Sequence, residues 1–183
     1  GLVSVCAGEG LTNIFKDLLV DEIIEGGQTM NPSAEDIAKA CDGIAAKDIF
    51  VLPNNKNIIL AAEQAKALSK RTIHIIPTKN IPQGLSAVLA FNPEDSAANN
   101  EAAMIEAISG IKAGMVTYAV RSTQIDDFNL KEGDIIGIDS KSIVAKGEKV
   151  EKVTKDLVEK MMDGDVSNIT LYFGDAVSEE EAN

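Results

Sequence analysis

Polar and small residues gather in four stretches of the first half of the sequence, each directly after a short apolar run. Such stretches form tight turns that present backbone N–H groups and neutral carboxamides. If the apolar runs are parallel strands, the turns meet at the carboxyl edge of one sheet, where open α/β sheets bind their ligands. The candidate residues for binding a small ligand or a protein partner are Gly8, Glu9, Gly10, Gln28, Thr29, Asn31, Ser33, Asn54, Asn55, Lys56, Thr78, Lys79, Gln83 and Gly84.

The first of these turns lies where a dinucleotide-binding loop would lie, between a strand and a helix. However, the third glycine position of that motif is Asn13, and Glu9 places a negative charge where a pyrophosphate would bind. The sequence also lacks the G-x-x-x-x-G-K-[ST] motif. The turn chemistry therefore argues against a nucleotide site. Lys56 and Lys79 could each hold a carboxylate or phosphate as a point charge, or could simply be solvated.

Residues that usually catalyse reactions or bind metals are few. His74 is the single histidine and lies within an apolar run, so we expect a half-buried side chain satisfied by hydrogen bonds. We expect Cys6 and Cys41 to be inert packing residues. Asp163-Gly164-Asp165 is best explained as the turn after a helix rather than as a magnesium site. We therefore predict no catalytic residue and no metal ligand.

The elements that position the four turns alternate along the first ninety residues. Apolar, β-branched runs predict strands, and helical spacing of apolar residues predicts helices between them. This order indicates an α/β fold, a parallel sheet with helices on both faces. The strands are Leu2–Ala7, Asp21–Glu25, Asp48–Leu52 and Thr72–Ile76, and the helices are Leu11–Leu19, Ser33–Ala45 and Asn57–Lys70.

The second half of the sequence is less regular and predicts mixed strands. Helices are expected over Ala87–Phe91, Ala97–Ile111 and the amphipathic segment Val150–Met161. Strands are expected at Met115–Val120, Asp134–Ile138, Ser142–Ala145 and Ile169–Phe173.

The domain organisation expected from these elements is a single α/β domain over residues 1–183. The sequence opens almost inside a strand and closes soon after Ser178 and Glu181, which have capping-box spacing. We therefore expect a piece of a longer polypeptide, truncated at its C-terminus.

Charge and composition narrow the function classes. The 183 residues carry 17 Lys and Arg against 29 Asp and Glu, a net charge of −12. That balance argues against binding to nucleic acid or to anionic membranes, because both need a basic face. Apolar runs long enough to span a membrane are absent. Two cysteines are too few for a disulfide framework, so the expected location is the cytoplasm.

Four strings give the sequence a specific resemblance: EGGQTMNPSAEDI, LPNNKNIILAA, IPTKNIPQGLSAVLAFNP and VTYAVRST. Over residues 2 to about 178, the chain resembles the carboxy-terminal domain of the bacterial DAK-type, YloV-like proteins (dihydroxyacetone-kinase-like), the ATP-binding subunits of fatty acid kinase. In that family, the resemblance implies, ATP and magnesium bind an amino-terminal domain and a middle domain carries a Cys/His metal site. Neither domain is in this sequence, so no cofactor is expected here.

The resemblance also implies a DegV-like fold, related to the family's fatty-acid-binding partners. By analogy, Thr29, Asn31 and Ser33 after the second strand, with Gln83 and Gly84 on a later loop, would receive an acyl carboxylate.

Three hypotheses for function follow. The first is a non-catalytic accessory domain of a fatty acid kinase that docks the DegV-type fatty-acid-binding protein or assembles the subunit with the other domains of the parent chain. The second is direct binding of a fatty acid or other carboxylate, with Thr29, Asn31 and Lys56 orienting the carboxylate. The third is a dihydroxyacetone kinase-like phosphotransferase; the parent protein is expected to be a kinase even if this part is not catalytic. A homodimer is possible in each case.

Overall fold

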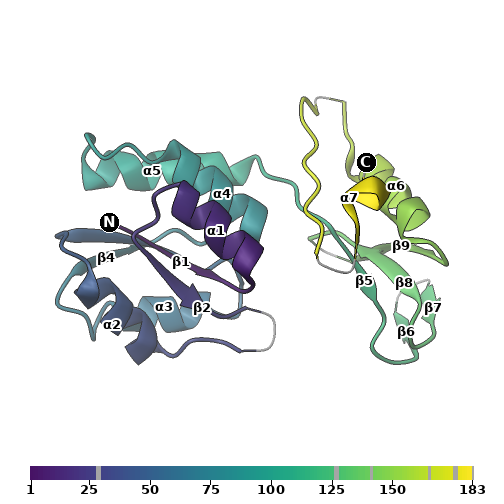
Figure 1. Ribbon diagram of the computed structural model, residues 1–183, viewed down its shortest axis with the longest axis horizontal. Coiled ribbons are helices and arrows are strands. Elements are labelled where there is room, and N and C mark those ends of the chain that lie inside the picture. The colour runs from purple at the N-terminus through teal and green to yellow at the C-terminus, as the bar shows by residue number, and fades with distance from the viewer. Residues whose placement is uncertain (28–29, 126–127, 141, 165, 175–176, 183) are drawn as a thin grey trace. The chain divides into compact units, whose positions relative to one another are not determined.

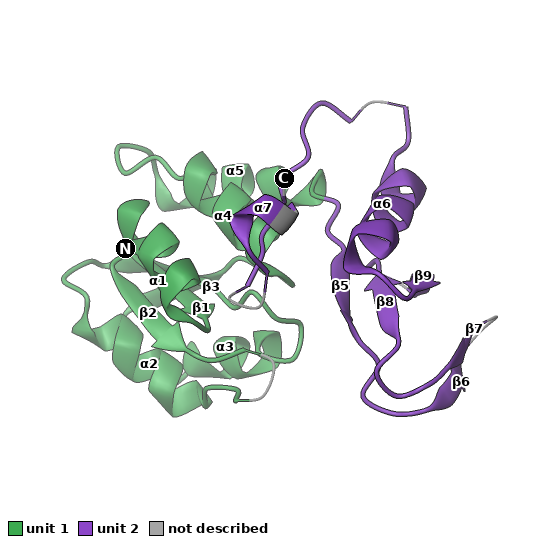
Figure 2. Cartoon of the chain, turned by 45° about the vertical axis from the view of Figure 1, so that its right-hand side comes forward, with its two compact units in different colours: residues 1–111 green, residues 112–183 purple. Residues whose placement is uncertain are grey.

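The computed structural model describes residues 1–183 except 28–29, 126–127, 141, 165, 175–176 and 183. The chain divides into two compact units, Gly1–Ile111 (unit 1) and Lys112–Asn183 (unit 2), which Figure 2 shows in separate colours. Each unit has its own buried clusters of apolar side chains. A division into two compact units does not establish that each unit folds alone, so a single domain over residues 1–183 stays a prediction.

Unit 1 contains a four-stranded parallel sheet within its described residues, in the order β2-β1-β3-β4. All three strand pairs are parallel, which confirms the predicted sheet. The elements are β1 (Leu2–Cys6), α1 (Glu9–Asp17), β2 (Glu22–Glu25), α2 (Ala34–Gly43), β3 (Asp48–Leu52), α3 (Ile59–Ala65), β4 (Thr72–Ile75), α4 (Ile81–Ala90) and α5 (Ala97–Ser109).

Helices cover both faces of this sheet, as Figure 1 shows, with α1, α4 and α5 on one face and α2 and α3 on the other. The alternation of side chains along a strand builds the two cores. Leu2, Phe50 and Leu52 pack with Phe15 of α1 and with the apolar side chains of α4 and α5. Val3, Val5, Ile49 and Val51 pack instead against α2 and α3. A central strand buried on both faces explains why its sequence is continuously apolar.

Helix α4 begins earlier than the sequence predicts. Pro82, Gln83 and Gly84 were expected in a loop, but they form its first turn. Proline is tolerated there because the first N–H groups of a helix have no partner within the helix. The carboxamide oxygen of Asn80 caps this end by accepting from the N–H of Gln83 at 2.9 Å.

Unit 2 contains an antiparallel sheet of β5 (Met115–Tyr118), β8 (Ile135–Ile138) and β9 (Ile143–Gly147), in that order. Helix α6 (Val150–Met161) packs its Val153 and Leu157 against this sheet. A hairpin of β6 (Thr123–Ile125) and β7 (Phe128–Leu130), which the sequence analysis does not foresee, contributes Leu130 to a second cluster with Ile136. A short helix, α7 (Glu179–Ala182), lies near the end of the chain.

The strand predicted at Ile169–Phe173 is wrong. These residues have no regular secondary structure, and the side chains of Ile169, Leu171, Tyr172 and Phe173 are about half exposed. Their β-branched and aromatic residues favour extended backbone, but a strand also needs a neighbour to accept its hydrogen bonds. Within the described residues of unit 2, the paired strands do not include this segment. Among the described residues, no helix is both long and apolar enough to cross a membrane.

Candidate functional site

The carboxyl ends of β1, β2, β3 and β4 lie at one edge of the sheet because the strands are parallel. We call the segments that follow them (residues 7–10, 26–33, 53–58 and 76–84) the carboxyl edge. All the candidate residues belong to these segments. Gln28 and Thr29 lie outside the described residues, so their part in the site stays a prediction.

Asn54 is the centre of the carboxyl edge. It has a left-handed backbone (φ +54°), which asparagine tolerates better than most residues, and it is only 8% exposed. Its Nδ2 donates to Ser4 Oγ at 2.9 Å and to the Val5 carbonyl at 3.0 Å. Its backbone N–H donates to Oγ1 of the buried Thr78 at 3.0 Å. One residue therefore ties the loop after β3 to β1 and to the loop after β4.

The side-chain oxygen of Asn54 explains why residue 84 is a glycine. Asn54 Oδ1 is buried and has no hydrogen-bond partner among the described residues. A Cβ placed on Gly84, in the first turn of α4, would lie 2.1 Å from this oxygen. Glycine is therefore required at position 84 by a close approach of the helix backbone to the carboxamide.

Asn55 and Gln83 fix the neighbouring loops. Asn55 Nδ2 donates to the Gly27 carbonyl at 3.1 Å, while Asn55 Oδ1 accepts from the N–H of Asn57 at 2.9 Å. Gln83 Oε1 accepts from the N–H of Lys79 at 2.8 Å. Side chains of the loops after β2, β3 and β4 thus hold these loops in place. The carboxamide groups of Asn55 and Gln83 are engaged in hydrogen bonds to the backbone.

Ser33 has a local structural role at the start of α2. Its Oγ accepts from the N–H of Asp36 at 3.1 Å, and the Asp36 carboxylate accepts from the N–H of Ser33 at 3.0 Å. This capping box satisfies free N–H groups of the helix. Hydrogen bonds from Ser33 also hold the pKa of Asp36 below its ordinary value.

Other candidate residues remain open to solvent at the carboxyl edge. Asn31, Lys56 and Lys79 are exposed, as are Gly8, Glu9 and Gly10 at the start of α1. Gly8 has φ +91°, which permits the tight entry into that helix. Within the described residues, these exposed groups are the ones available to a ligand or partner.

His74 confirms the interpretation of a satisfied, half-buried histidine. Its Nδ1 lies 2.9 Å from Glu101 Oε2 on α5, and its Nε2 lies 3.0 Å from Asp48 Oδ1 at the start of β3. Its ring stacks on Phe50 with the centroids 5.0 Å apart. The bond from His74 lowers the pKa of Asp48. These contacts attach α5 to the sheet.

The cysteines are buried, as predicted. Burial raises the pKa of Cys6, and it raises the pKa of Cys41 to about 11. Both thiols therefore stay protonated near neutral pH and are poor nucleophiles. Asp163 forms an ion pair with Lys112. The described residues include no group of three or more His, Cys, Asp or Glu side chains suited to a metal ion.

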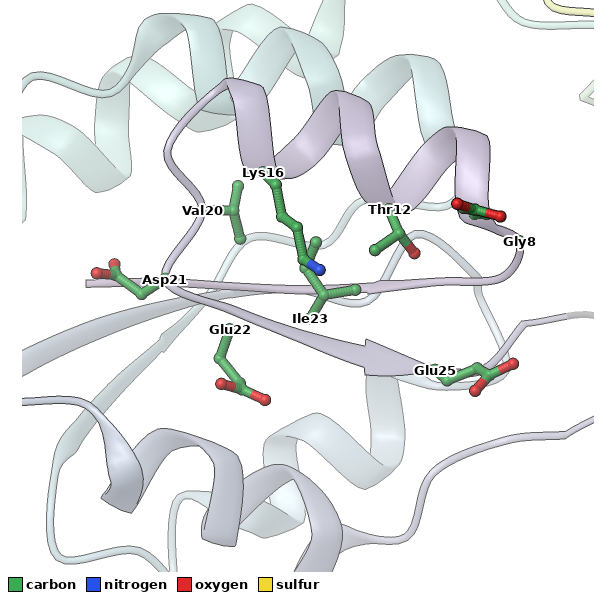
Figure 3. Close-up of a pocket in the computed structure, with 9 residues that line it drawn as sticks. Gly8, Thr12, Lys16, Val20, Asp21, Glu22, Ile23 and Glu25 are labelled. Carbon is green, nitrogen blue, oxygen red and sulfur yellow. The ribbon is translucent and has the colours of Figure 1, made fainter.

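The sequence analysis missed a groove of about 510 Å³ between α1 and β2, shown in Figure 3. It begins at Gly8 and Glu9 of the carboxyl edge and runs along β2. Lys16 points into it from α1 toward Ile23, Asp21 and Glu25 lie near the two ends of β2, and the Glu22 side chain points to the other face of that strand. A signal for it was present in the sequence, because a short strand with glutamates at both ends (EIIE) is typical of a sheet edge.

A solved structure shares this fold. A DegV family protein of Corynebacterium glutamicum superposes with a TM-score of 0.57 over 87% of this chain and 71% of that chain. The two sequences are 14% identical, so the likeness shows the fold alone. It confirms the predicted DegV-like α/β architecture.

Sequence comparison identifies the family. The chain is 44% identical over 182 residues to protein YloV of Bacillus subtilis, covering all of this chain and 33% of YloV. It is 39% identical over 174 residues to an uncharacterized protein of Staphylococcus saprophyticus, covering 94% of this chain and 31% of that protein. The chain thus spans about a third of the length of these curated relatives. The family of FakA-like C-terminal domains, named for the A-type subunit of fatty acid kinase, matches residues 1–183, and the chain therefore belongs to it.

Proposed function

We propose that this chain is a non-catalytic accessory domain of a cytoplasmic fatty acid kinase. Its carboxyl edge docks the DegV-type protein that carries the fatty acid, or assembles the subunit with the other domains of the parent chain. ATP and magnesium would bind a different part of the parent protein, where phosphoryl transfer to the acyl carboxylate would take place.

The observation that carries this proposal is the fixed geometry of the carboxyl edge. Asn54 and Asn55 tie the loops after β2, β3 and β4 together through hydrogen bonds to Thr78 and Gly27. Asn31, Lys56 and the 65% exposed Met30 remain at the surface of the same edge. A preorganised surface that mixes polar and apolar groups suits a protein partner, since little loop ordering opposes binding.

The alternatives receive less support. For a bound fatty acid, the apolar side chains between sheet and helices are the natural tail-binding region, but they are packed together: Phe15, Ile37, Ile49 and Leu52 are fully buried. For a phosphotransferase, the groove that includes Gly8 also includes the carboxylates of Glu9 and Glu25, which repel phosphate groups.

The test is titration calorimetry of this chain with the DegV-type fatty-acid-binding protein of the same organism, loaded and unloaded with fatty acid. We expect saturable binding that the Lys56→Glu variant weakens by about tenfold, a cost of about 1.4 kcal/mol. Lys152→Glu makes the same charge change on the exposed face of α6 in unit 2 and should change the affinity less than about twofold.

Docking is overturned if neither form of the protein gives heat at concentrations above about 100 µM, where weak contacts would register. Assembly within the subunit then becomes the remaining form of the proposal. It is measured by whether the full-length protein loses its oligomeric state or acyl phosphorylation when residues 1–183 are deleted, and no loss would reject it. A fatty acid retained by the purified chain in native mass spectrometry would favour the carboxylate-binding alternative.

A further inference from the structure

The groove along β2 lies beside a strand that has a neighbour on one side. Within the described residues, β2 pairs with β1 and ends the sheet. In a parallel pair, alternate residues of a strand bond to its neighbour. The N–H of Gly26, directly after β2, donates to the Cys6 carbonyl at 3.0 Å. By alternation Glu22 and Ile24 also bond to β1, and the backbone groups of Ile23 and Glu25 point away from β1, toward the open edge.

The side chains beside this edge select the charge of an occupant. Four acidic residues border the groove or the edge of β2, against the single ammonium group of Lys16 in the groove lining. Glu9 and Glu25 lie at the groove, Asp21 directly precedes β2, and the Glu22 side chain points to the opposite face of the strand. Asp21 accepts from the N–H of Leu2 at 2.7 Å. The carboxylates of Glu9, Glu22 and Glu25 make no hydrogen bond or ion pair within the described part of the chain. They can therefore pair with positive charges from outside.

The same charges disfavour a second copy of this chain. Edge strands that carry charges resist pairing with themselves, because two copies would bring glutamates together. The half-buried Ile23, on the α1 side of β2, offers a small apolar contact between the charges. The edge of β2 therefore fits an extended strand that presents basic side chains near Glu22 on one face and near Glu25 on the other, with an apolar side chain near Ile23.

We propose that β2 and the groove beside it receive an extended basic segment of a protein partner, which adds to the sheet as a further strand. The proposal deepens the docking role proposed above and rests on it, since it names the chemistry that the partner brings to the β2 end of the carboxyl edge. Main-chain hydrogen bonds to Ile23 and Glu25 supply the affinity, and the carboxylates supply the selectivity.

The experiment uses the six-residue peptide Val-Lys-Val-Val-Lys-Val, blocked at both ends, whose two lysines have the same spacing as Glu22 and Glu25. It is titrated into the isotope-labelled chain and followed by NMR. We expect amide hydrogen exchange at Ile23 and Glu25 to slow at least about fivefold at saturation, since strand addition protects outward-facing N–H groups. Glu22→Gln combined with Glu25→Gln should weaken the peptide's affinity at least about fivefold, because two opposite-charge pairs are lost.

The matched control removes the same charge elsewhere. Glu179→Gln combined with Glu180→Gln changes two exposed glutamates of α7, and it should alter the affinity less than about twofold. Equal weakening by the two double variants would show attraction to the overall charge of −12, and would overturn the proposal. Shift changes without slower exchange at Ile23 and Glu25 would also overturn it.

Failure here is distinguishable from failure of the docking role. If the DegV-type protein binds the wild-type chain but Glu22→Gln with Glu25→Gln leaves its affinity unchanged, docking stands and the basic-strand proposal is rejected. If that protein does not bind at all while the peptide protects β2, the docking role falls, and β2 remains a strand-accepting edge for another basic partner.

Discussion

Unit 1 and unit 2 bury their apolar side chains to different degrees. In unit 1 the central strands are covered on both faces, and Asn54 and Asn55 at the carboxyl edge are engaged in internal hydrogen bonds. In unit 2 the buried clusters are smaller, and Tyr118, Val120 (88% exposed) and the apolar residues near 170 lie open to solvent. The comparison teaches that unit 1 is built around two large buried clusters, whereas unit 2 has small clusters beside a larger share of exposed apolar side chains.

The largest expected effect comes from dividing the chain at the boundary between the two units. We expect Gly1–Ile111 alone to unfold cooperatively on heating, and Lys112–Asn183 alone to show no cooperative transition, because its cores are small. Circular dichroism and calorimetry of the two pieces measure this. If Gly1–Ile111 is unfolded by itself, the single domain expected from the sequence is supported instead.

The same substitution in each unit sharpens the contrast. Phe15 in α1 is fully buried, whereas Phe173 in unit 2 is 51% exposed. Phe15→Ala should lower the free energy of unfolding by about 3–5 kcal/mol, since it leaves a cavity in the core. Phe173→Ala should cost less than about 1 kcal/mol, as surface changes usually do. Denaturant titrations of both variants decide the matter, and equal losses would contradict the packing described here.

A pair of glycines tests the hydrogen-bonded edge of unit 1. Gly84→Ala pushes a methyl group against Asn54 Oδ1, whereas a Cβ at Gly174 in unit 2 meets nothing within 4 Å. We expect Gly84→Ala to destabilise the protein by roughly 1–3 kcal/mol, although alanine favours helices by about 1 kcal/mol. Gly174→Ala should be nearly neutral. Faster amide exchange at Asn54 in the Gly84 variant would locate the damage; an unchanged rate would not fit.

The helix starts of the two units should respond in opposite directions. Ser33 caps α2, but Lys149 begins α6 without a side-chain cap. Ser33→Ala should destabilise unit 1 by about 1 kcal/mol, and Lys149→Asp should stabilise unit 2 by about 0.5–1 kcal/mol, because aspartate accepts from free N–H groups and suits the helix dipole. Local amide exchange in α2 and α6 measures both effects.

The smallest expected effect is on the loss of stability at acidic pH. Hydrogen bonds from Ser33 lower the pKa of Asp36 from its ordinary 3.8. A lowered folded pKa gives stability that is complete above 3.8 and is lost as the pH falls through the folded value. Stability measured between pH 6 and about 2 should therefore fall less steeply in Asp36→Asn than in the wild type. Parallel profiles would mean that the capping box does not respond to pH.

The sequence alone predicted the features that depend on the local pattern of apolar and polar residues. The strands of unit 1 and the convergence of its four loops follow from apolar runs and from the parallel order. Features that depend on distant neighbours were not accessible. The approach of Asn54 to Gly84 needs the positive φ of Asn54 and the position of α4, neither of which leaves a periodic signal. Residues 169–173 have the composition of a strand but lack a paired neighbour among the described residues.

The contact between Asn54 and Gly84 also has an evolutionary consequence. The carboxamide at 54 holds β1 and two loops together, and it leaves no room for a side chain at 84. A mutation at either position alone is therefore selected against, while a compensated double change remains open. Across natural relatives the two positions should drift as a linked pair, with a larger residue at 84 appearing in lineages that have first replaced the asparagine.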